Sequence, residues 1–306
     1  MSDSRYDLIV IGAGITGLTA SKHAVQKGLA TANIETMLFG GLVININELD
    51  PAPPGESMSG TELASTLMME ISDLGVANLS ETVGALSRDG DFLTVTTDAG
   101  THRARAVIVA SGARLKRLGV PGEAEFEGRG VSQCADCDGA MFKDEEVVVV
   151  GGGDSALQEA LVLANYCKHV HLVHRGAKFR ARQHLIDAVA GRKNIHPVWN
   201  TVVEEVLGAQ TVNKVRVRDV IAGGTREIPS SGLFAYIGLE PVCSFAPPEI
   251  KRDSDGFLTA DKSMQTAMAG VYAAGAVRAG YGGLISDAVV EAQTAATAVA
   301  TALGKR

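Results

Sequence analysis

The chain has 306 residues, 46% of them hydrophobic and 21% charged, which is typical of a globular protein long enough for two domains. A formal net charge of -7 argues against a nucleic-acid surface, which would need clustered Lys and Arg to neutralise phosphates. No apolar run approaches the roughly 18 residues that a membrane span requires, and the first residues, MSDSRYDLIV, lack the basic segment of a signal peptide. We therefore expect a cytoplasmic protein.

The first predicted elements are a strand, a tight turn and a helix within YDLIVIGAGITGLTASKHAVQKG. The turn carries Gly12, Gly14 and Gly17, and a segment with helical apolar spacing follows it. In a dinucleotide-binding fold the first glycine permits the turn, the second lets the backbone approach a pyrophosphate, and the third lets helix and strand pack closely. The phosphate would then lie at the helix N-terminus, where unpaired N–H groups favour anions.

The next strand, IETMLFGG, is expected to end at Gly40, where an acidic residue would otherwise bind the adenosine ribose. Glu35, Glu48 and Asp50 are the nearby alternatives, and backbone and water are another. This half of the pattern closes in DFLTVTTDAGTHRARAVIVASGARL, which predicts two alternating strands around residues 98–100 and then a separate apolar strand ending in SG.

A second copy of the pattern begins at EEVVVVGGGDSALQEALVLANYCKHVHLVHR. Gly151, Gly153 and Ala156 occupy the three glycine positions, and VNKVRVRDVIAGGTREIPSSGLFAYIGLEP repeats the closing strands. Two such patterns indicate an internal duplication of a nucleotide-binding unit. The expected fold class is α/β, with two Rossmann-like dinucleotide-binding domains of the three-layer ββα type.

Basic residues follow the second strand of the second copy, about 20 residues beyond its glycines, where an acid would bind an unphosphorylated ribose. Arg175 and Arg180, helped by Lys178, can pair with a 2′-phosphate, because guanidinium groups match phosphate oxygens. NADPH is therefore favoured over NADH. The alternative is that these residues are solvated surface cations.

Between the two copies lies VSQCADCDGAMF, residues 131 to 142, with Cys134 and Cys137 separated by two residues. A structural zinc site, a buried inert pair and accidental spacing are possible interpretations, but no second pair of ligands has suitable spacing for zinc. We favour a dithiol that cycles with a disulfide, because a two-residue spacer lets the sulfurs bridge. Asp138 could pass a proton to or from a departing thiolate, or could cap the turn that follows.

Two histidines and two cysteines elsewhere in the chain are further candidates for metal or redox chemistry. His171 and His174 flank one predicted strand, but without a third ligand we expect no metal, a nucleotide contact for His174 and a half-buried sheet position for His171. His196 belongs to no pattern. Cys167 and Cys243 are expected to be apolar filler.

Taken together, these motifs resemble the low-molecular-weight thioredoxin reductase family of flavoproteins. The resemblance covers essentially the whole chain, and the motifs that carry it are GAGITGL, ASGA at 110–113, CADCDG at 134–139, GGGDSALQEA at 151–160, HRGAKFRA at 174–181 and GVYAAGAVR at 270–278. It implies an FAD domain from residues 1–113 and 242–306, with an NADPH domain, 114–241, inserted in it. It also implies a homodimer.

The implied mechanism passes electrons from NADPH through FAD into a Cys134–Cys137 disulfide. Cys137 would be the sulfur nearer the flavin, Cys134 would attack an outside disulfide, and Asp138 would donate and accept the proton. The NADPH domain would rotate between half-reactions about ARLKRLGVPG and GLEPVCS. The residues expected to bind the cofactors are Gly12, Gly14, Gly17, Ser111, Gly112, Gly275, Ala276 and Val277 for FAD and Gly151, Gly153, Asp154, Ser155, His174, Arg175 and Arg180 for NADPH.

The chain departs from the family pattern at several cofactor positions. Gly40 stands at the expected ribose ligand, and Ala276 replaces an aspartate of the flavin site. Gly282 and Gly283 replace an Arg-Gln pair, and Gly176 replaces the second arginine of a His-Arg-Arg run. We therefore expect weaker FAD binding and softer discrimination against NADH.

The expected partner is a thioredoxin-like protein or a small disulfide, with no nucleic acid and no membrane. The alternatives are a flavin-dependent dithiol oxidase that uses O2, and a non-catalytic redox sensor. The oxidase ranks second because Arg175 and Arg180 remain.

Overall fold

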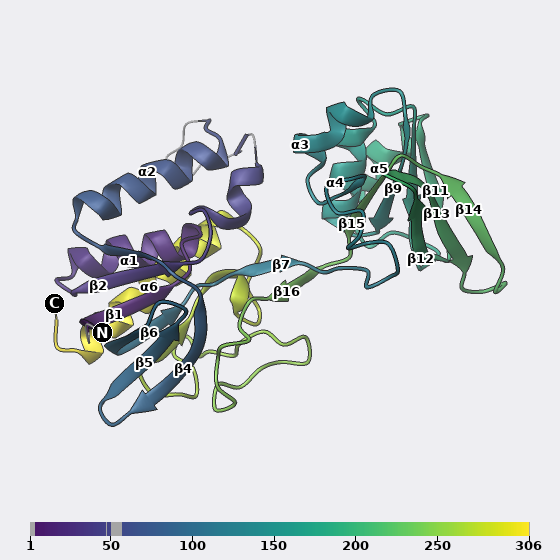
Figure 1. The fold of residues 1–306 in the computed structure, drawn as a ribbon. Helices are drawn as coiled ribbons and strands as arrows, with labels where there is room; N and C mark the ends of the chain where they lie inside the picture. Colours follow the sequence, from purple (N-terminus) through teal and green to yellow (C-terminus); the bar gives the residue numbers. More distant parts are fainter. Residues whose placement is uncertain (1–3, 47, 50–56, 306) are drawn as a thin grey trace. The chain divides into compact units, whose positions relative to one another are not determined.

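The computed structural model describes residues 4–46, 48–49 and 57–305, which fold into two compact units (Figure 1). Unit 1 comprises Met1–Arg114 and Glu240–Arg306, and unit 2 comprises Leu115–Leu239. Asp50, one of the expected alternatives for a ribose ligand, lies outside the described residues.

The sheet of unit 1 has the strand order β3-β2-β1-β6-β5-β4, and β17 also pairs with β6. Its strands are β1 (Ser4–Ile11), β2 (Thr31–Glu35), β3 (Ala77–Ser80), β4 (Val83–Asp89), β5 (Phe92–Thr97), β6 (Thr101–Val109) and β17 (Val271–Ala273). β1, β2, β3, β6 and β17 pair in parallel, whereas β4 and β5 extend the sheet in antiparallel fashion.

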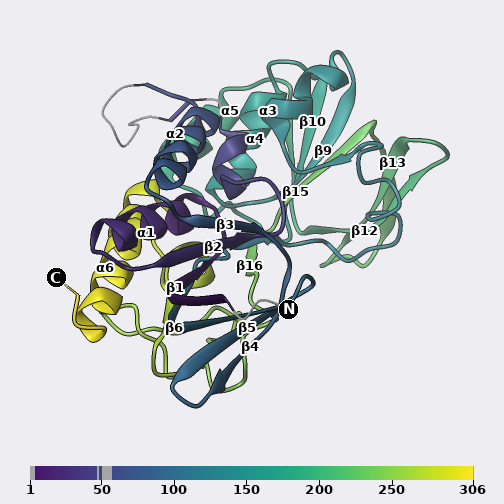
Figure 2. The same cartoon turned by 60° about the vertical axis from the view of Figure 1, so that its left-hand side comes forward.

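The helices of unit 1 cover one face of this sheet. They are α1 (Ile15–Gln26), α2 (Gly60–Asp73) and α6 (Ile285–Ala302), with short 3-10 turns η1 (Gly41–Asn45) and η3 (Gly275–Val277). Leu8 and Val10 of β1 pack against α1 and α6, which lie side by side (Figures 1 and 2), while Ile9 and Ile11 face the opposite core with β4 and β5. This alternation follows from the two-residue period of a strand.

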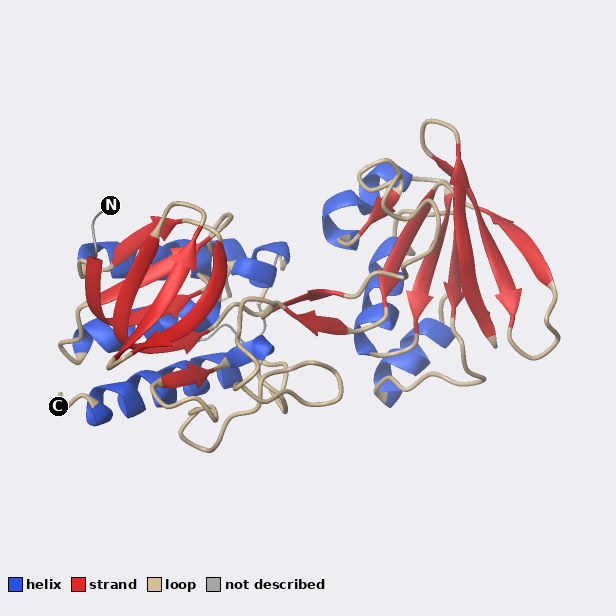
Figure 3. Ribbon diagram, turned by 60° about the horizontal axis from the view of Figure 1, so that its bottom comes forward, coloured by secondary structure: helices blue, strands red, loops and turns tan. Residues whose placement is uncertain are grey.

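Unit 2 has a parallel sheet in the order β11-β10-β9-β15-β8 and a separate antiparallel sheet, β12-β13-β14 (Figure 3). Its strands are β8 (Val131–Ser132), β9 (Glu146–Gly151), β10 (His169–Val173), β11 (Ile195–Val198), β12 (Thr201–Gly208), β13 (Val212–Asp219), β14 (Thr225–Pro229) and β15 (Gly232–Tyr236). Its helices are α3 (Ala135–Asp138), α4 (Asp154–Leu163) and α5 (Gln183–Ala190), with the 3-10 turn η2 (Gly139–Phe142).

Different elements cover the two faces of the parallel sheet in unit 2. Val147 and Val149 pack into a core with α4 and α5, whereas Val148 and Val150 pack against the antiparallel sheet. Unit 2 therefore has a layer of helices, a parallel sheet and a second sheet. In unit 1, the antiparallel strands β4 and β5 belong to the same sheet as the parallel strands, and their side chains pack against its face opposite the helices. The predicted α/β fold class with two Rossmann-like domains is confirmed.

Two predicted strands have different bounds in the structure. β2 ends at Glu35 instead of Gly40, because Met37 and Leu38, which continue the apolar run, are 82% and 69% exposed. The apolar strand before Ser111 is not separate either. It is the second half of β6, whose first half pairs with β5 and whose second half pairs with β17.

The chain passes between the units through a two-stranded ribbon, β7 (Ala113–Leu115) and β16 (Leu239–Pro241) (Figure 3). Backbone hydrogen bonds continue the pairing beyond the strands, from Lys116 N to Gly238 O and from Val242 N to Gly112 O. These are the two segments that the sequence predicts as hinges. The rotation of the NADPH domain about them stays a prediction.

Candidate active site

The two cysteines of the CxxC motif form a disulfide at the start of α3. The S–S distance is 2.08 Å, and the Cα atoms lie 5.3 Å apart. Cys134 is the N-cap of α3, and its Sγ accepts a hydrogen bond from the Cys137 N–H at 3.1 Å. An N–H that points at this sulfur stabilises a thiolate there. Cys137 is the more exposed residue and Cys134 is half-buried.

Asp138 lies in a hydrogen-bonded chain that leads back to Cys134. The Ser132 hydroxyl donates to Asp138 Oδ2 at 2.5 Å and accepts from the Cys134 N–H at 3.1 Å. Asp138 does precede η2, but its side chain makes no capping hydrogen bond, so the interpretation as a cap is wrong. Ser132 was not among the expected site residues, although it stands two residues before the first cysteine.

A groove of about 240 Å³ opens beside Cys134 within unit 2. Its walls include charged side chains, since Arg117 pairs with Glu127 at 2.7 Å and the buried Glu123 carboxylate accepts two backbone N–H groups. The residues that line it are Arg117, Glu123, Glu127, Gly128, Val131, Ser132, Gln133, Cys134 and Asp138. The groove therefore brings one redox sulfur and the Asp138 carboxyl to one accessible place.

Behind α3 lies a second carboxyl group, that of Glu159 on α4. Its Oε2 accepts hydrogen bonds from the Ala135 N–H and the Tyr236 hydroxyl, each at 3.3 Å. Burial, with a further contribution from the charge of Asp136, raises the pKa of Glu159 above its usual value. Sequence reasoning missed this residue, whose only signal is an acid within an otherwise apolar helix face.

The first glycine turn has the geometry of a phosphate cradle. Gly12 has φ +107°, and a Cβ there would lie 2.4 Å from Ala110 O; a Cβ at Gly17 would lie 1.8 Å from Gly12 O. Both are therefore needed for the turn and the packing. Gly14 is different, because its φ of -71° is ordinary and a Cβ would meet only Gly40 O, at 3.8 Å. A side chain there would fill open space at the uncapped N-terminus of α1, which fits the approach of a pyrophosphate.

An acidic residue does stand at the end of β2. Glu35 Oε2 accepts from the Ala13 N–H at 2.8 Å, and its Oε1 accepts from the Met37 N–H at 3.0 Å. The carboxylate therefore touches the glycine turn itself, which is the place of a ribose ligand in this fold. The expectation that Gly40 occupies this position is wrong, because it rested on a strand that continued five residues too far.

The predicted flavin residues near both chain ends meet at the carboxyl edge of this sheet. A Cβ on Gly12 would also touch Ser111, and a Cβ on Gly275 would lie 2.2 Å from Thr16 Oγ1 on α1. Ser111 Oγ donates to Val242 O at 2.5 Å, and Gly112 has φ +70°. Parallel strands end at a common edge, so motifs far apart in the sequence form one surface.

The η3 turn, which contains Gly275, Ala276 and Val277, is held by a buried ion pair that sequence reasoning missed. Glu291 is 8% exposed, and its Oε2 accepts from the Gly275 N–H at 2.8 Å. The same carboxylate binds the Arg278 guanidinium through both of its oxygens. The sequence signal that could have identified Glu291 is a charged residue in the middle of an apolar terminal helix.

The second glycine turn repeats the cradle in unit 2. Gly151 has φ +154°, and a Cβ there would lie 2.5 Å from both Ala156 and Tyr236 O. Gly153 has φ -99°, no atom lies within 4 Å of its Cβ position, and it forms the uncapped N-terminus of α4. Ser155 is exposed in the first turn. Gly153 therefore matches Gly14, with room for a ligand where a side chain would stand.

The Asp154 carboxylate accepts hydrogen bonds from another residue of the same unit. Its Oδ1 accepts from the Arg182 N–H at 2.8 Å and its Oδ2 from Arg182 Nε at 2.6 Å. These bonds, led by the one from the backbone, lower the pKa of Asp154. The structure thus uses Asp154 to fix the residue before α5, and the expected cofactor contact of this carboxylate stays a prediction.

His174 supports the nucleotide loop from beneath. It is 6% exposed, and a Cβ on Gly152 would lie 2.2 Å from its Nδ1. Burial first, and then the charges of Arg180 and Arg175, lower the pKa of His174, so the ring is neutral at pH 7. Arg175 and Arg180 are themselves exposed, and Arg180 N donates to Gly152 O at 2.7 Å. The loop therefore carries two cations beside the glycine turn.

The family model for pyridine nucleotide-disulphide oxidoreductases matches residues 6–302. The thioredoxin reductase of Treponema pallidum is 37% identical over 278 residues, which cover 90% of each chain. That of Listeria innocua is 38% identical over 275 residues, 90% of this chain and 86% of the other. This chain belongs to the thioredoxin reductase family. The crystal structure of Lactococcus lactis thioredoxin reductase in its FR conformation aligns with a TM-score of 0.90 at 33% identity, over 97% of this chain and 98% of that one.

The resemblance to the low-molecular-weight thioredoxin reductase family is confirmed, and so is the class of reaction. This member of the thioredoxin reductase family is an oxidoreductase that uses FAD and NADPH to reduce disulfides. At two glycines, Gly14 and Gly153, the structure leaves room for a ligand beside the N-terminus of a helix. Bound FAD supplies the two electrons that reduce the Cys134–Cys137 disulfide.

The two other cysteines lie outside the redox pair. Cys167 and Cys243 are buried, as expected of filler residues, and burial raises the pKa of Cys167 to about 11. Such a thiol is inert at neutral pH.

Within 4–46, 48–49 and 57–305, the structure has no helix of sufficient length and apolarity to span a bilayer.

Proposed function

We propose that this chain transfers electrons from NADPH to a thioredoxin-like protein disulfide through Cys134 and Cys137, with Asp138 as the proton carrier. The observation that carries the proposal is the disulfide at the edge of an open groove, joined to Asp138 through Ser132. The relatives named as thioredoxin reductases support thioredoxin as the substrate.

Cys134, Cys137 and Asp138 together carry the electrons and the proton to the substrate. After reduction, the Cys134 thiolate attacks one sulfur of the substrate disulfide, and that bond breaks as a mixed disulfide forms. Cys137 then attacks Cys134 and releases the second substrate thiol, so the protein disulfide is restored and the substrate gains two electrons and two protons. Asp138 delivers a proton to a departing sulfur, and its Ser132 bond holds it at the groove.

The two units divide the cofactors between them in this proposal. Unit 1, which carries Gly12, Gly14 and Gly17, binds FAD, and Glu35 holds its adenosine ribose. Unit 2 binds NADPH at the turn from Gly151 to Gly153. Arg175 and Arg180 are the exposed cations available for a 2′-phosphate.

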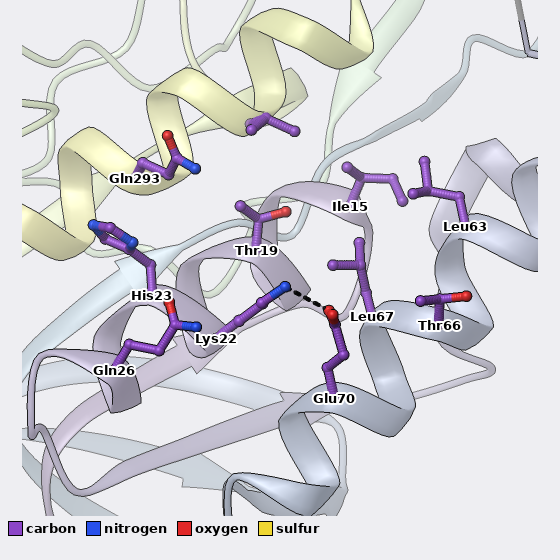
Figure 4. Close-up of a pocket in the computed structure, with 11 residues that line it drawn as sticks. Ile15, Thr19, Lys22, His23, Gln26, Leu63, Thr66, Leu67, Glu70 and Gln293 are labelled. Atoms are coloured by element: carbon purple, nitrogen blue, oxygen red, sulfur yellow. Dashed lines mark hydrogen bonds and ion pairs between the residues drawn. The ribbon is translucent and has the colours of Figure 1, made fainter. Parts of the chain in front are cut away.

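We also propose a homodimer in the cytoplasm. A cleft of about 290 Å³ between α1, α2 and α6 has apolar walls that include Leu63, Leu67 and Val289, and Lys22 pairs with Glu70 across it (Figure 4). On α2 and α6, Met69 and Val290 are 68% and 61% exposed. Exposed apolar side chains of this size support burial by a second copy, which sedimentation analysis would detect.

The test of the proposed function is spectroscopic and kinetic. Adding NADPH without oxygen to the purified yellow protein should bleach the flavin band, and a thioredoxin should then oxidise NADPH catalytically. Cys134→Ser should abolish turnover and leave flavin reduction intact, because the variant removes only the attacking sulfur. Cys167→Ala, which removes a buried thiol between α4 and β10, is the matched control.

Other outcomes would contradict the proposal. Bleaching by dithiols but not by NADPH would indicate the oxidase, and a protein that takes up no flavin would exclude the electron path. Turnover in Cys134→Ser would remove this sulfur from the role of nucleophile.

A further inference from the structure

A carboxyl group lies where the redox helix α3 packs on α4 in unit 2 (Figure 1). Ala135, the first residue of α3, is fully buried, and Tyr236, the last residue of β15, is 8% exposed. Glu159 of α4 is half-buried, and its Oε2 accepts hydrogen bonds from the Ala135 N–H and the Tyr236 hydroxyl. This one carboxyl group therefore connects α3, α4 and β15 at the start of the redox helix.

Glu159 contacts the peptide group that joins Cys134 to Ala135, since its Oε2 lies 3.3 Å from the Ala135 nitrogen. Cys134 Sγ accepts a hydrogen bond from the Cys137 N–H at 3.1 Å, and this bond favours a thiolate on Cys134 once the disulfide is reduced. A carboxylate beside the same peptide group has the opposite effect, because two neighbouring negative charges repel each other. The charge of Glu159 therefore bears directly on how easily the redox pair accepts electrons.

We propose that Glu159 takes up a proton when the Cys134–Cys137 disulfide is reduced and releases it when the disulfide forms again. Glu159 is a positioning residue in this role, because it acts on Cys134 through the Ala135 peptide and through its charge. The inference rests on the redox role of the two cysteines in the proposed function. It adds a proton acceptor behind α3, and it is independent of the identity of the substrate.

The charges and protons of this step balance. Two electrons break the S–S bond and leave two negative charges on the sulfurs; one proton neutralises one sulfur, and a second proton neutralises Glu159. The site thus carries one negative charge before reduction, on Glu159, and one afterwards, on Cys134. When the Cys134 thiolate reduces a substrate disulfide, Glu159 and the thiol give up their protons, and the substrate gains two electrons and two protons.

The surroundings of Glu159 support a change of its charge. The titratable groups that face it are Asp136 on α3 and Tyr236 on β15. Burial first, and then the charge of Asp136, raise the pKa of Glu159, and the bonds from Ala135 and Tyr236 oppose this rise. Burial first, and then the charge of Glu159, raise the pKa of Tyr236, so its hydroxyl stays a neutral donor. Glu159 therefore ionises closer to neutral pH than an exposed glutamate does.

The variant Glu159→Gln separates this role from a merely structural one. It keeps an oxygen that can accept the Ala135 N–H, so α3 stays attached to α4, but it carries no charge at any pH. A carboxyl that only holds α3 in place would make the variant differ from the parent equally at every pH. A carboxyl that takes up a proton makes the difference between them depend on pH, because the variant lacks that proton uptake.

The experiment measures how easily the pair is reduced at several pH values. The full-length, flavin-loaded protein is equilibrated with mixtures of reduced and oxidised dithiothreitol, and alkylation of Cys134 and Cys137 followed by mass spectrometry gives the reduced fraction. At high pH the equilibrium constant for reduction of Glu159→Gln should exceed that of the parent on the order of 10-fold, which corresponds to one unit of pKa. The two constants should converge at low pH, where Glu159 of the parent is protonated.

A second variant and a control complete the test. Tyr236→Phe removes a hydroxyl that donates to Glu159, so the carboxyl should ionise at a higher pH, and the reduction constant should separate from that of Glu159→Gln at a higher pH than in the parent. Glu125→Gln, at an exposed position in unit 2, is the matched control and should follow the parent. Circular dichroism verifies that each variant is folded.

Two outcomes would overturn the proposal, and they have different meanings. A ratio of the Glu159→Gln constant to the parental constant that is the same at every pH would remove Glu159 from proton uptake and leave the proposed function intact. A parent whose cysteines do not exchange with dithiothreitol would overturn the proposed function as well.

Discussion

Ser132 shows how one hydroxyl can organise a redox site. It accepts from the Cys134 N–H and donates to Asp138, so it sets the position of a proton carrier relative to a sulfur. Ser132 is a positioning residue, because it acts on the reaction through Asp138. Its effect therefore belongs to the proton step, not to cofactor binding.

Replacing Ser132 by Ala should slow reduction of the disulfide substrate by about 3- to 10-fold, the net contribution of one typical hydrogen bond. The pH profile of kcat should shift, while the rate of flavin reduction by NADPH should be unchanged. Ser132→Thr keeps the hydroxyl and should restore most of the activity. If Ser132→Thr is as slow as Ser132→Ala with an unshifted profile, the hydroxyl does not position Asp138.

Two of the expected site residues have protein partners that the sequence did not reveal. Asp154 binds Arg182, 28 residues away, and His174 is buried beside Gly152, while their expected cofactor contacts stay predictions. At Gly14 and Gly153, neither φ nor internal packing demands a glycine. The approach of a dinucleotide to the backbone at these positions stays a prediction.

At the scale of elements, α6 and η3 are joined by Glu291. This side chain bridges the Gly275 N–H and the Arg278 guanidinium in a buried position. The hydrogen bond to Glu291 is the first cause that raises the pKa of Arg278. Removing one partner of such a pair leaves the other charge buried and uncompensated.

Glu291→Ala should therefore lower the free energy of unfolding by about 3 to 5 kcal/mol and reduce flavin retention. Thermal unfolding and the flavin-to-protein absorbance ratio would measure the two effects. Glu249→Ala, which truncates an exposed glutamate in unit 1, is the control and should have little effect. Full stability with normal flavin content in Glu291→Ala would show that the pair does not hold the turn.

Glu81, between β3 and β4, ties three parts of the unit 1 sheet together. It accepts hydrogen bonds from Thr97 of β5 at 2.6 Å and from His102 of β6 at 2.7 Å. The Thr97 bond is the largest of the effects that lower the pKa of Glu81 below its ordinary 4.5. A carboxyl whose pKa is depressed in the folded state stabilises the protein above its unfolded pKa and loses this contribution as pH falls.

The free energy of unfolding should therefore decrease as the pH falls from about 6 to about 3, and Glu81→Gln should make this decrease smaller. Urea unfolding at several pH values would measure the slope. Glu125→Gln, at an exposed position in unit 2, is the control and should keep the parental slope. An identical slope in Glu81→Gln would mean that this carboxyl does not contribute to acid stability.

At the scale of the whole molecule, the chain consists of two units with separate hydrophobic cores. Ligands stabilise the folded state that binds them by mass action. If unit 1 binds FAD and unit 2 binds NADPH, each cofactor should stabilise its own unit.

Calorimetry of the flavin-loaded protein should show two unfolding transitions, and the oxidised nucleotide NADP⁺ should raise only one of them. Arg175→Ala should reduce this shift, because it removes a cation available to the 2′-phosphate, whereas Arg192→Ala, an exposed change elsewhere in unit 2, should not. Limited proteolysis would assign each transition to a unit. A nucleotide-induced shift of the unit 1 transition alone would contradict the proposed division of cofactors.

The sequence by itself determined the fold class, the family and the redox pair, because these depend on local patterns. Glycine spacing, strand alternation and the two-residue spacer between Cys134 and Cys137 are each readable within a short window. Tertiary structure alone decided which side chains meet. Glu35 at the glycine turn, Glu291 under Gly275 and the contact of His169 with His196 all depend on where strands end and which strands are neighbours. These contacts join residues 16 to 27 positions apart, so no short sequence pattern reveals them.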